Sequence, residues 1–180
     1  MREILNNIEI KSAPDSCWTP IKTKPRCEKK LAAYCHSNSI GYYLPLLKSA
    51  KRQKRKNLVF YLPMFPGYIF CLLNTENFNM IVNSNCVVNK LKTDKIQEKT
   101  LIEELLSIKE LEMKSDELEI CIQPEIINGK KIRIKGGPLQ GFSGIVSKRK
   151  NKTLVSVNLE MLGQSISAEI DIEFIEAEED

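Results

Sequence analysis

The chain has 180 residues, of which 42% are hydrophobic and 28% charged, so it can bury a core and form one ordinary domain or two small ones. It contains no apolar run near the ~20 residues needed to span a bilayer, and its start lacks the apolar core of a signal peptide, so we expect a cytoplasmic protein. The net charge is +4, but residues 1–120 carry 19 basic and 14 acidic side chains whereas residues 121–180 carry 8 and 9, which suggests two modules.

The first third of the chain predicts a leader, a strand and a helix. Residues 1–15 show no periodicity and are interpreted as a flexible leader. Residues 17–23 are typical of a strand, and Pro20 favours an edge position or an irregular start because proline cannot donate to a ladder. Pro25 suits the first position of a helix that ends by Gly41. Its apolar stripe has helical spacing and comprises Cys27, Leu31, Tyr34 and Cys35.

A second strand is predicted at residues 42–47, and it is followed by the most basic segment of the chain. Residues 48–56 hold six basic side chains in nine positions, and desolvating unpaired charges is costly, so we expect a solvated loop or hairpin tip there. The apolar run at residues 63–73 favours a central strand. A short helix at 78–82, a strand at 87–91 and an amphipathic helix at 96–113 follow.

This order of elements predicts an α+β fold in which a split βαβ sandwich, similar to ferredoxin, spans residues 16–113. Residues 114–127 contain no full element and are interpreted as a linker. Five short β-prone runs separated by turn signals then predict a small closed barrel at residues 128–180. The runs are 130–135, 144–150, 153–160, 165–170 and 172–176.

Two stretches resemble one known family. Residues 63–70, preceded by Trp18 and by residues 41–45, look like the N-terminal domain of NusG-type transcription elongation factors. Residues 129–146 resemble the KOW motif of the same proteins, whose barrel is SH3-like and five-stranded. The motif residues are Gly129, Arg133, Gly137, Pro138, Gly141 and Gly144. The glycines serve geometry, because no Gly-Lys-Ser/Thr follows and the next element is a strand, which argues against a phosphate loop.

The resemblance implies a regulator of transcription elongation or antitermination that binds the clamp helices of the largest RNA polymerase subunit. Aromatic residues beside the Pro66-Gly67 bend are then expected to form an exposed depression that holds this helical hairpin. The residues assigned to polymerase binding are Trp18, Tyr42, Tyr43, Phe65, Pro66, Tyr68 and Phe70. Burial in the core is the alternative for these rings, above all for Phe70.

The basic residues suggest contact with the non-template strand or the upstream DNA duplex. Residues 22–56 hold eleven basic side chains and one acid, Glu28, and such density attracts phosphates. The assigned residues are Lys22, Lys24, Arg26, Lys29, Lys48, Lys51, Arg52, Lys54, Arg55 and Lys56. A solubilising hairpin tip is the alternative interpretation.

Enzymatic and metal chemistry are not expected. His36 is the one histidine and lies beside Cys35, but adjacent side chains diverge on a helix, so a Cys–His nucleophilic pair is badly placed. The six cysteines include no Cys-x-x-Cys spacing and are interpreted as reduced, buried thiols, and we expect no cofactor and no metal.

The family resemblance leaves several questions open. For the KOW domain it implies Rho or a small-subunit ribosomal protein as partner, and we expect a monomer. The sequence does not separate a general factor from an operon-specific paralogue, although residues 42–46 and 155–165 look more like the latter. In one specialised branch the C-terminal domain refolds into a helical hairpin; here its glycines and β-branched residues favour the barrel. A ribosome-associated RNA-binding protein is the rival, and the near-neutral C-terminal region argues against it.

Overall fold

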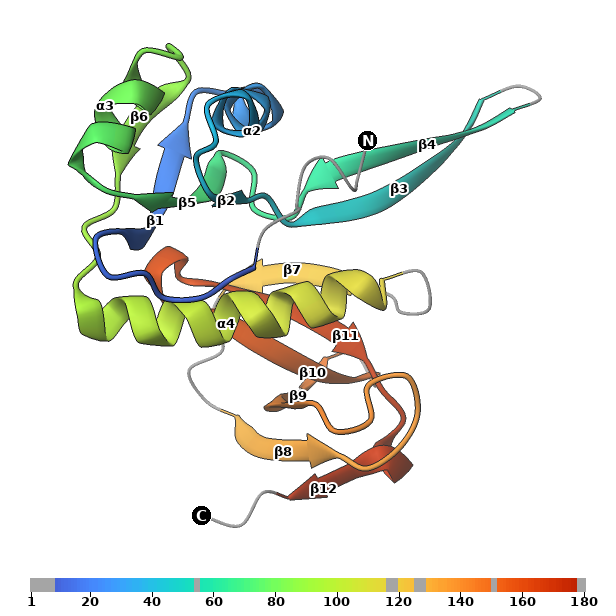
Figure 1. Ribbon diagram of the computed structural model, residues 1–180. Helices are drawn as coiled ribbons and strands as arrows, with labels where there is room; N and C mark the ends of the chain where they lie inside the picture. The colour runs from blue at the N-terminus through green and yellow to red at the C-terminus, as the bar shows by residue number, and fades with distance from the viewer. Residues whose placement is uncertain (1–8, 54–55, 116–119, 125–128, 150–151, 178–180) are drawn as a thin grey trace. The chain divides into compact units, whose positions relative to one another are not determined.

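The computed structural model describes residues 9–53, 56–115, 120–124, 129–149 and 152–177. The chain divides into two compact units, Met1–Glu103 and Glu104–Asp180, which are treated separately below. Figure 1 shows helices and strands mixed in the first unit and strands dominating the second. The predicted α+β class is confirmed.

The first unit is built on a four-stranded antiparallel sheet with the order β2-β5-β1-β6. Its strands are β1 (Cys17–Thr23), β2 (Tyr42–Tyr43), β5 (Tyr68–Leu73) and β6 (Val87–Lys90). The predicted edge position of β1 is wrong, because β1 pairs with both β5 and β6. Pro20 is tolerated in this central strand because its missing N–H costs only one ladder bond, and its carbonyl still accepts the Leu91 N–H at 3.0 Å.

Helices α2 (Glu28–Ser37) and α3 (Thr75–Val82) cover one face of this sheet (Figure 1). Side chains from the helices and strands form one core cluster, which includes Ile21, Leu31, Ala32, Cys35, Ile69, Cys71 and Ile81. α3 begins at Thr75, earlier than the predicted start at residue 78, because Asn74 caps it: its Oδ1 accepts the Asn77 N–H at 2.8 Å. α2 begins at Glu28 and not at Pro25, because Arg26 has φ 61° and interrupts the helical path.

Helix α4 (Lys95–Met113) matches the predicted helix at residues 96–113, and the division between the two units falls inside it. Within the first unit, its buried Glu98 accepts the backbone N–H of Trp18 at 2.9 Å through Oε1. The other oxygen of Glu98 accepts a hydrogen bond from Lys95 Nζ at 2.9 Å. The first turn of α4 is therefore tied to β1 by a single carboxylate.

Residues 9–15, part of the predicted leader, make specific contacts in the first unit. Ile10 is buried, and the Lys11 carbonyl accepts the indole N–H of Trp18 at 2.9 Å. Residues 1–8 lie outside the described part of the chain. The described end of the leader is therefore fixed on β1.

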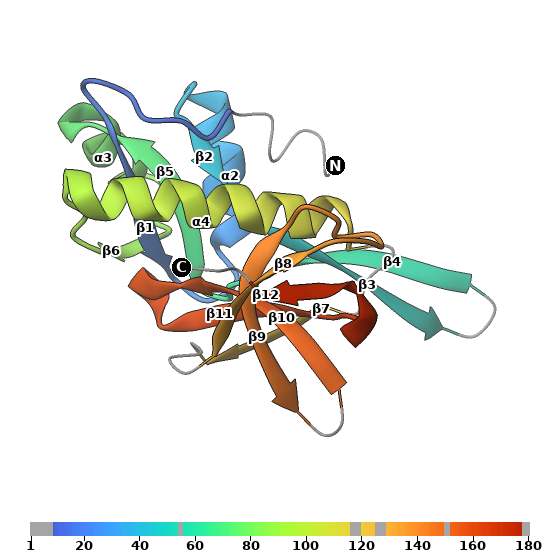
Figure 2. The same cartoon turned by 90° about the horizontal axis from the view of Figure 1, so that it is seen from below.

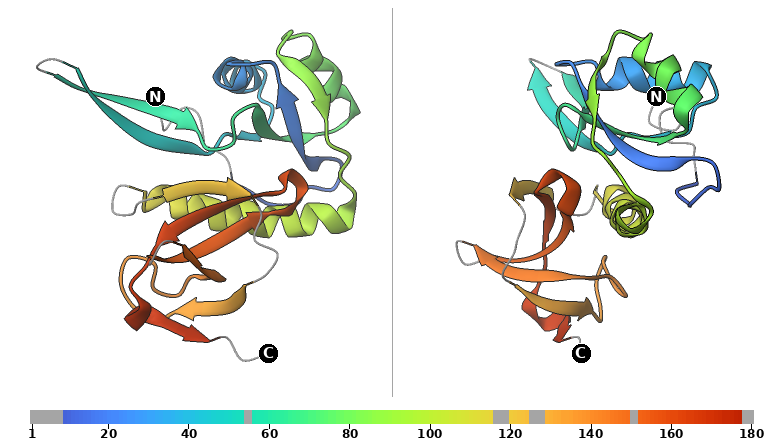
Figure 3. Two further views of the ribbon diagram at one scale, coloured as in Figure 1. Left: turned by 180° about the vertical axis from the view of Figure 1, so that it is seen from behind. Right: turned by 90° about the vertical axis from the view of Figure 1, so that its left-hand side faces the viewer.

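Strands β3 (Leu46–Gln53) and β4 (Lys56–Pro63) form a separate two-stranded antiparallel ribbon. Figures 1 and 3 show it extending away from the four-stranded sheet. Its pairs run from Leu46 opposite Pro63 to Gln53 opposite Lys56. The predicted hairpin at residues 48–56 is present, but most of its basic positions lie in the strands and not only at the tip.

The second unit is a six-stranded antiparallel sheet with the order β12-β8-β9-β10-β11-β7, seen from below in Figure 2. The strands are β7 (Ile120–Pro124), β8 (Lys130–Ile134), β9 (Ser143–Arg149), β10 (Lys152–Leu159), β11 (Gln164–Glu169) and β12 (Ile175–Ala177). All five predicted runs contain strand. The interpretation of residues 114–127 as a linker without an element is wrong at 120–124, where β7 pairs with β11. Closure into an SH3-like barrel stays a prediction.

Candidate functional site

The bend between β4 and β5 is a tight turn fixed by hydrogen bonds. Tyr68 donates its backbone N–H to the Phe65 carbonyl at 3.0 Å, and Gly67 has φ +84°. Proline at the second position and a left-handed glycine at the third are the signature of a type II turn, which explains why Pro66 and Gly67 occur together. The Gly67 carbonyl accepts the Thr23 N–H at 2.8 Å, so the turn is also tied to the end of β1.

Most of the aromatic rings predicted to line an open depression are buried. Trp18, Tyr42, Tyr43, Phe65 and Phe70 all have 5% or less of their surface exposed. The prediction that these rings form an exposed depression is therefore wrong. The alternative, burial in the core, holds for Phe70, whose ring meets that of Phe65 edge to face with centroids 6.0 Å apart.

Strand geometry explains this burial. Successive side chains alternate between the two faces of a sheet, so Tyr42, with Ile69 and Cys71, joins the cluster beneath α2. Phe70, opposite Pro20, and Tyr43, opposite Phe70, belong to the other face. Both faces of the sheet are buried at these positions, so neither parity leaves a ring open to solvent.

The accessible part of the predicted site is the turn itself. Pro66 is exposed, and Gly67 and Tyr68 are half-buried. Tyr68 pairs with the exposed Lys22 across β5 and β1, on the same face as Phe70. Pro66, Tyr68 and Lys22 therefore offer an apolar, an aromatic and a cationic side chain at this end of the sheet, next to buried aromatic residues.

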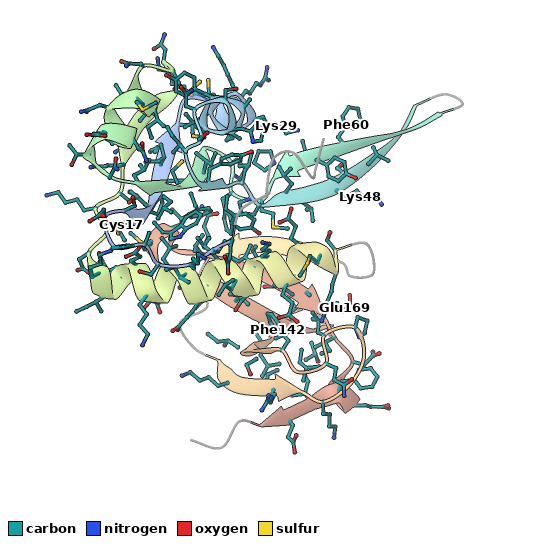
Figure 4. The ribbon with its side chains drawn as sticks, viewed as in Figure 1. Cys17, Lys29, Lys48, Phe60, Phe142 and Glu169 are labelled. Carbon is teal, nitrogen blue, oxygen red and sulfur yellow. The ribbon has the colours of Figure 1, made fainter. Side chains whose placement is uncertain are left out.

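The ribbon carries exposed apolar side chains that the sequence analysis passed over. Val59, Phe60 and Leu62 are 48%, 44% and 52% exposed. Figure 4 shows Phe60 on β4 and Lys48 on β3 of this ribbon. The signal was present in the sequence, because five consecutive apolar residues at 58–62 in a two-stranded ribbon cannot all be covered.

The basic residues divide into three groups. Lys22, Lys24, Arg26 and Lys48 are exposed, as nucleic-acid contact requires, although Lys24 also donates to Asn85 Oδ1 at 2.6 Å. Lys29 is half-buried and donates its ammonium to the Tyr61 carbonyl, so it braces the ribbon. Lys54 and Arg55 lie outside the described residues, as do the side chains of Lys51, Arg52 and Lys56, whose backbone lies in β3 and β4.

The KOW-like residues lie in or just before β8, in β9 and in the connection between these strands, which contains Gly137, Pro138 and Gly141. Gly137 and Gly141 have φ +77° and +85°. A Cβ on Gly144 would lie 2.8 Å from the Ser156 carbonyl, which no side chain permits. Gly129, Arg133 and Pro138 are exposed. The glycines thus fit the role of close backbone approach that the sequence predicts.

The cysteines do not form a reactive site among the described residues. Cys35 is buried while His36 is exposed, so the two side chains point apart. A hydrogen bond to Cys35, together with burial, raises the pKa of Cys71 well above its ordinary value. Burial and the nearby Glu98 raise the pKa of Cys17. Cys17, Cys27, Cys35, Cys71 and Cys86 are free thiols.

The described residues lack two kinds of feature. They contain no group of three or more His, Cys, Asp or Glu side chains that could share a metal ion. They also contain no helix with the length and apolar character needed to cross a membrane.

Comparisons with known proteins identify the first unit. A family model described as "Transcription termination factor nusG" matches residues 16–105. Two crystal structures of the MjSpt4:Spt5 complex, conformations A and B, align with 19% and 17% identity and TM-scores of 0.28 and 0.27. These alignments cover 91% of this chain in both cases, and 99% and 97% of the matched chains. No curated protein gives a significant match.

Proposed function

The chain belongs to the NusG family, as the match over residues 16–105 shows, and from this premise we propose that it regulates transcription elongation by binding RNA polymerase. Family members are transcription factors without enzymatic activity. The observation that carries the proposal is the hydrogen-bonded turn from Phe65 to Tyr68, with Pro66 exposed, in the matched region. Antitermination, a cytoplasmic location and a monomeric state belong to the same proposal.

The proposed polymerase-binding surface is centred on the accessible turn. Pro66 and Tyr68 contact the clamp helices of the largest subunit, and Lys22 lies beside them. Phe65, the first residue of the turn, is buried and packs edge to face on the buried Phe70, whereas Trp18, Tyr42 and Tyr43 support the turn only as core residues of the sheet. A turn that is ordered before binding loses little conformational entropy when a helix docks on it.

The mechanism needs binding energy alone. A factor held on the clamp stabilises the elongating state of polymerase only to the extent that it binds this state more tightly than the paused one. A tenfold preference corresponds to about 1.4 kcal/mol, which is enough to shorten pauses without any chemical step.

The ribbon and its neighbours are the proposed nucleic-acid contact. Lys22, Arg26 and Lys48 are exposed, Lys51, Arg52 and Lys56 lie in β3 and β4, and the sequence adds Lys54 and Arg55 between these strands. The ribbon therefore combines apolar and basic residues, which suits a place where polymerase and DNA meet. Each phosphate contact adds to the salt dependence of binding.

The C-terminal region is proposed to be a KOW domain that recruits a second partner, Rho or a small-subunit ribosomal protein. The antiparallel order of its strands and the tight approach of Gly144 to β10 support this assignment. Residues 16–113 are then the N-terminal domain and 128–180 the KOW domain, with β7 from the intervening segment added to the C-terminal sheet.

An elongation assay with purified core polymerase on a template containing a strong pause tests this proposal. The protein is expected to shorten the pause, and Tyr68→Ala is expected to lose most of this effect. Tyr34→Ala is the matched control, because Tyr34 is also half-buried but lies on α2. Unchanged pause lifetimes with the wild-type protein would contradict the proposal.

A further inference from the structure

Two consecutive residues in the first turn of α2 hold the chain from Tyr61, near the end of β4, to Gly67, the last residue before β5. The Glu28 carboxylate accepts the Gly67 N–H at 2.7 Å through Oε1. Lys29 donates its ammonium to the Tyr61 carbonyl, and Figure 4 shows Lys29 on α2 near the base of the ribbon. The braced segment contains Phe65 and Pro66.

The hydrogen bond between Glu28 and the Gly67 N–H is buried, because the Glu28 side chain is shielded from solvent. Glu28 is only 7% exposed, and a buried carboxylate is costly unless it is hydrogen-bonded. Its position as the first residue of α2 places it at the positive end of the helix dipole, which favours the charge. Cys27, the N-cap residue, makes no side-chain capping bond. Glu28 is the acidic side chain in the first turn of this helix.

The direction of the Gly67 N–H depends on the left-handed conformation of that residue. With φ +84°, Gly67 directs its N–H to Glu28 while its carbonyl accepts from Thr23. The peptide group before Gly67 is thus held by α2, and the peptide group after it is held by β1. Pro66 and Tyr68, the accessible residues of the turn, flank this doubly held glycine.

We propose that Glu28 is a positioning residue for polymerase binding: it sets the angle at which the turn presents Pro66 and Tyr68, without touching the polymerase itself. This inference rests on the function proposed above. Lys29 is the second brace, which holds β4 before the turn. The role also explains the one acid in the basic stretch of residues 22–56, since its charge is turned inward to the Gly67 amide.

The test separates positioning from a general contribution to helix stability. Glu28→Ala removes the acceptor, and Glu28→Gln keeps an oxygen in the same place. Glu76→Ala is the matched control, because Glu76 is also a first-turn acid but is exposed and lies on α3. Three quantities are measured on the full chain: the Kd for core polymerase, the exchange rate of the Gly67 amide by NMR, and the unfolding midpoint from the fluorescence of Trp18.

The hydrogen bond from the Gly67 N–H to the Glu28 carboxylate has a charged acceptor and is therefore strong. Its loss in Glu28→Ala should weaken polymerase binding about tenfold and accelerate exchange of the Gly67 amide by at least ~10-fold. Glu28→Gln is expected to stay within about threefold of the wild type, and Glu76→Ala within about twofold. If Glu28→Ala is too unstable to assay, Glu28→Asp replaces it, because this variant keeps the charge but shortens the side chain that reaches the Gly67 amide. Accelerated Gly67 exchange together with weakened polymerase binding then supports the role, and binding like that of the wild type overturns it.

Several results would overturn the inference. Glu28→Ala could expose the Gly67 amide and still bind polymerase like the wild type, which would show that the turn angle does not matter. Equal losses in Glu28→Ala and Glu76→Ala would reduce the effect to helix stability. Accelerated exchange in Glu28→Ala, with no polymerase binding by the wild-type protein, would instead reject the proposed function and leave the brace as a purely structural contact.

Discussion

The carboxylate of Glu98 offers a quantitative test of how α4 is held in the first unit. It is buried, and it accepts the Trp18 N–H and the Lys95 ammonium, each at 2.9 Å. Glu98→Ala leaves the Trp18 N–H without this acceptor. Hydrogen bonds to charged groups contribute about 1.5–3 kcal/mol, so the free energy of unfolding of this unit should fall by about 2–3 kcal/mol.

The single tryptophan makes the measurement local, because Trp18 lies on β1 and its own N–H is the donor in question. With a urea m-value of about 1–1.5 kcal/mol/M for a unit of this size, the fluorescence midpoint should fall by roughly 2 M. Glu98→Gln keeps an oxygen acceptor and should lose less, about 1 kcal/mol. Lys95→Ala removes an exposed partner and should change the midpoint little. A midpoint for Glu98→Ala within about 0.3 M of the wild type would refute this reasoning.

Three further predictions concern backbone conformation and thiol chemistry. Gly67→Ala meets no atom within 4 Å, so its expected cost of about 1–2 kcal/mol comes from φ +84° alone and should appear in the same urea titration. Gly144→Ala meets the Ser156 carbonyl at 2.8 Å and should broaden or lose the NMR signals of β9 and β10, whereas a well-dispersed, wild-type-like spectrum would refute the close approach. The pKa of Cys71 is raised, so less of its thiolate is present at any given pH. Alkylation of Cys71 by iodoacetamide at pH 8 should therefore be much slower in the native protein than in urea. Equal rates would show that the fold does not suppress the reactivity of this thiol.

Elements with local signals were predicted well from the sequence. The short helix predicted at residues 78–82 is present, but it begins earlier, at Thr75, because Asn74 caps it. The helix at residues 96–113 followed from its periodicity and is confirmed as α4. The start of α2 was missed because it depends on the left-handed conformation of Arg26, which its residue type does not favour.

Non-local pairing explains the other differences. Residues 120–124 become a strand because they pair with β11, 40 to 48 positions later in the chain, and nothing in their own short sequence signals this partner. Pro20 was placed at an edge by a rule that holds for most strands, but a single missing donor is compatible with pairing on both sides.

The turn was predicted in position, but the exposure of the rings beside it was not. Pro66 and Gly67 marked the turn correctly, because their conformational preferences are local. Strand alternation tells which face of the sheet a side chain such as Phe65 or Tyr43 lies on, but it does not tell whether that face is covered. Both residues are buried. Lys29 was grouped with the other basic residues by charge, and only the structure shows its ammonium on the Tyr61 carbonyl.

The central claim, that the turn binds the polymerase clamp, is tested most directly by measuring the affinity of the full chain for core RNA polymerase in the presence of a competing clamp-helix fragment. The account predicts that the fragment displaces the protein and that Tyr68→Ala weakens binding while Tyr34→Ala does not. Binding that neither the fragment nor Tyr68→Ala reduces would contradict it.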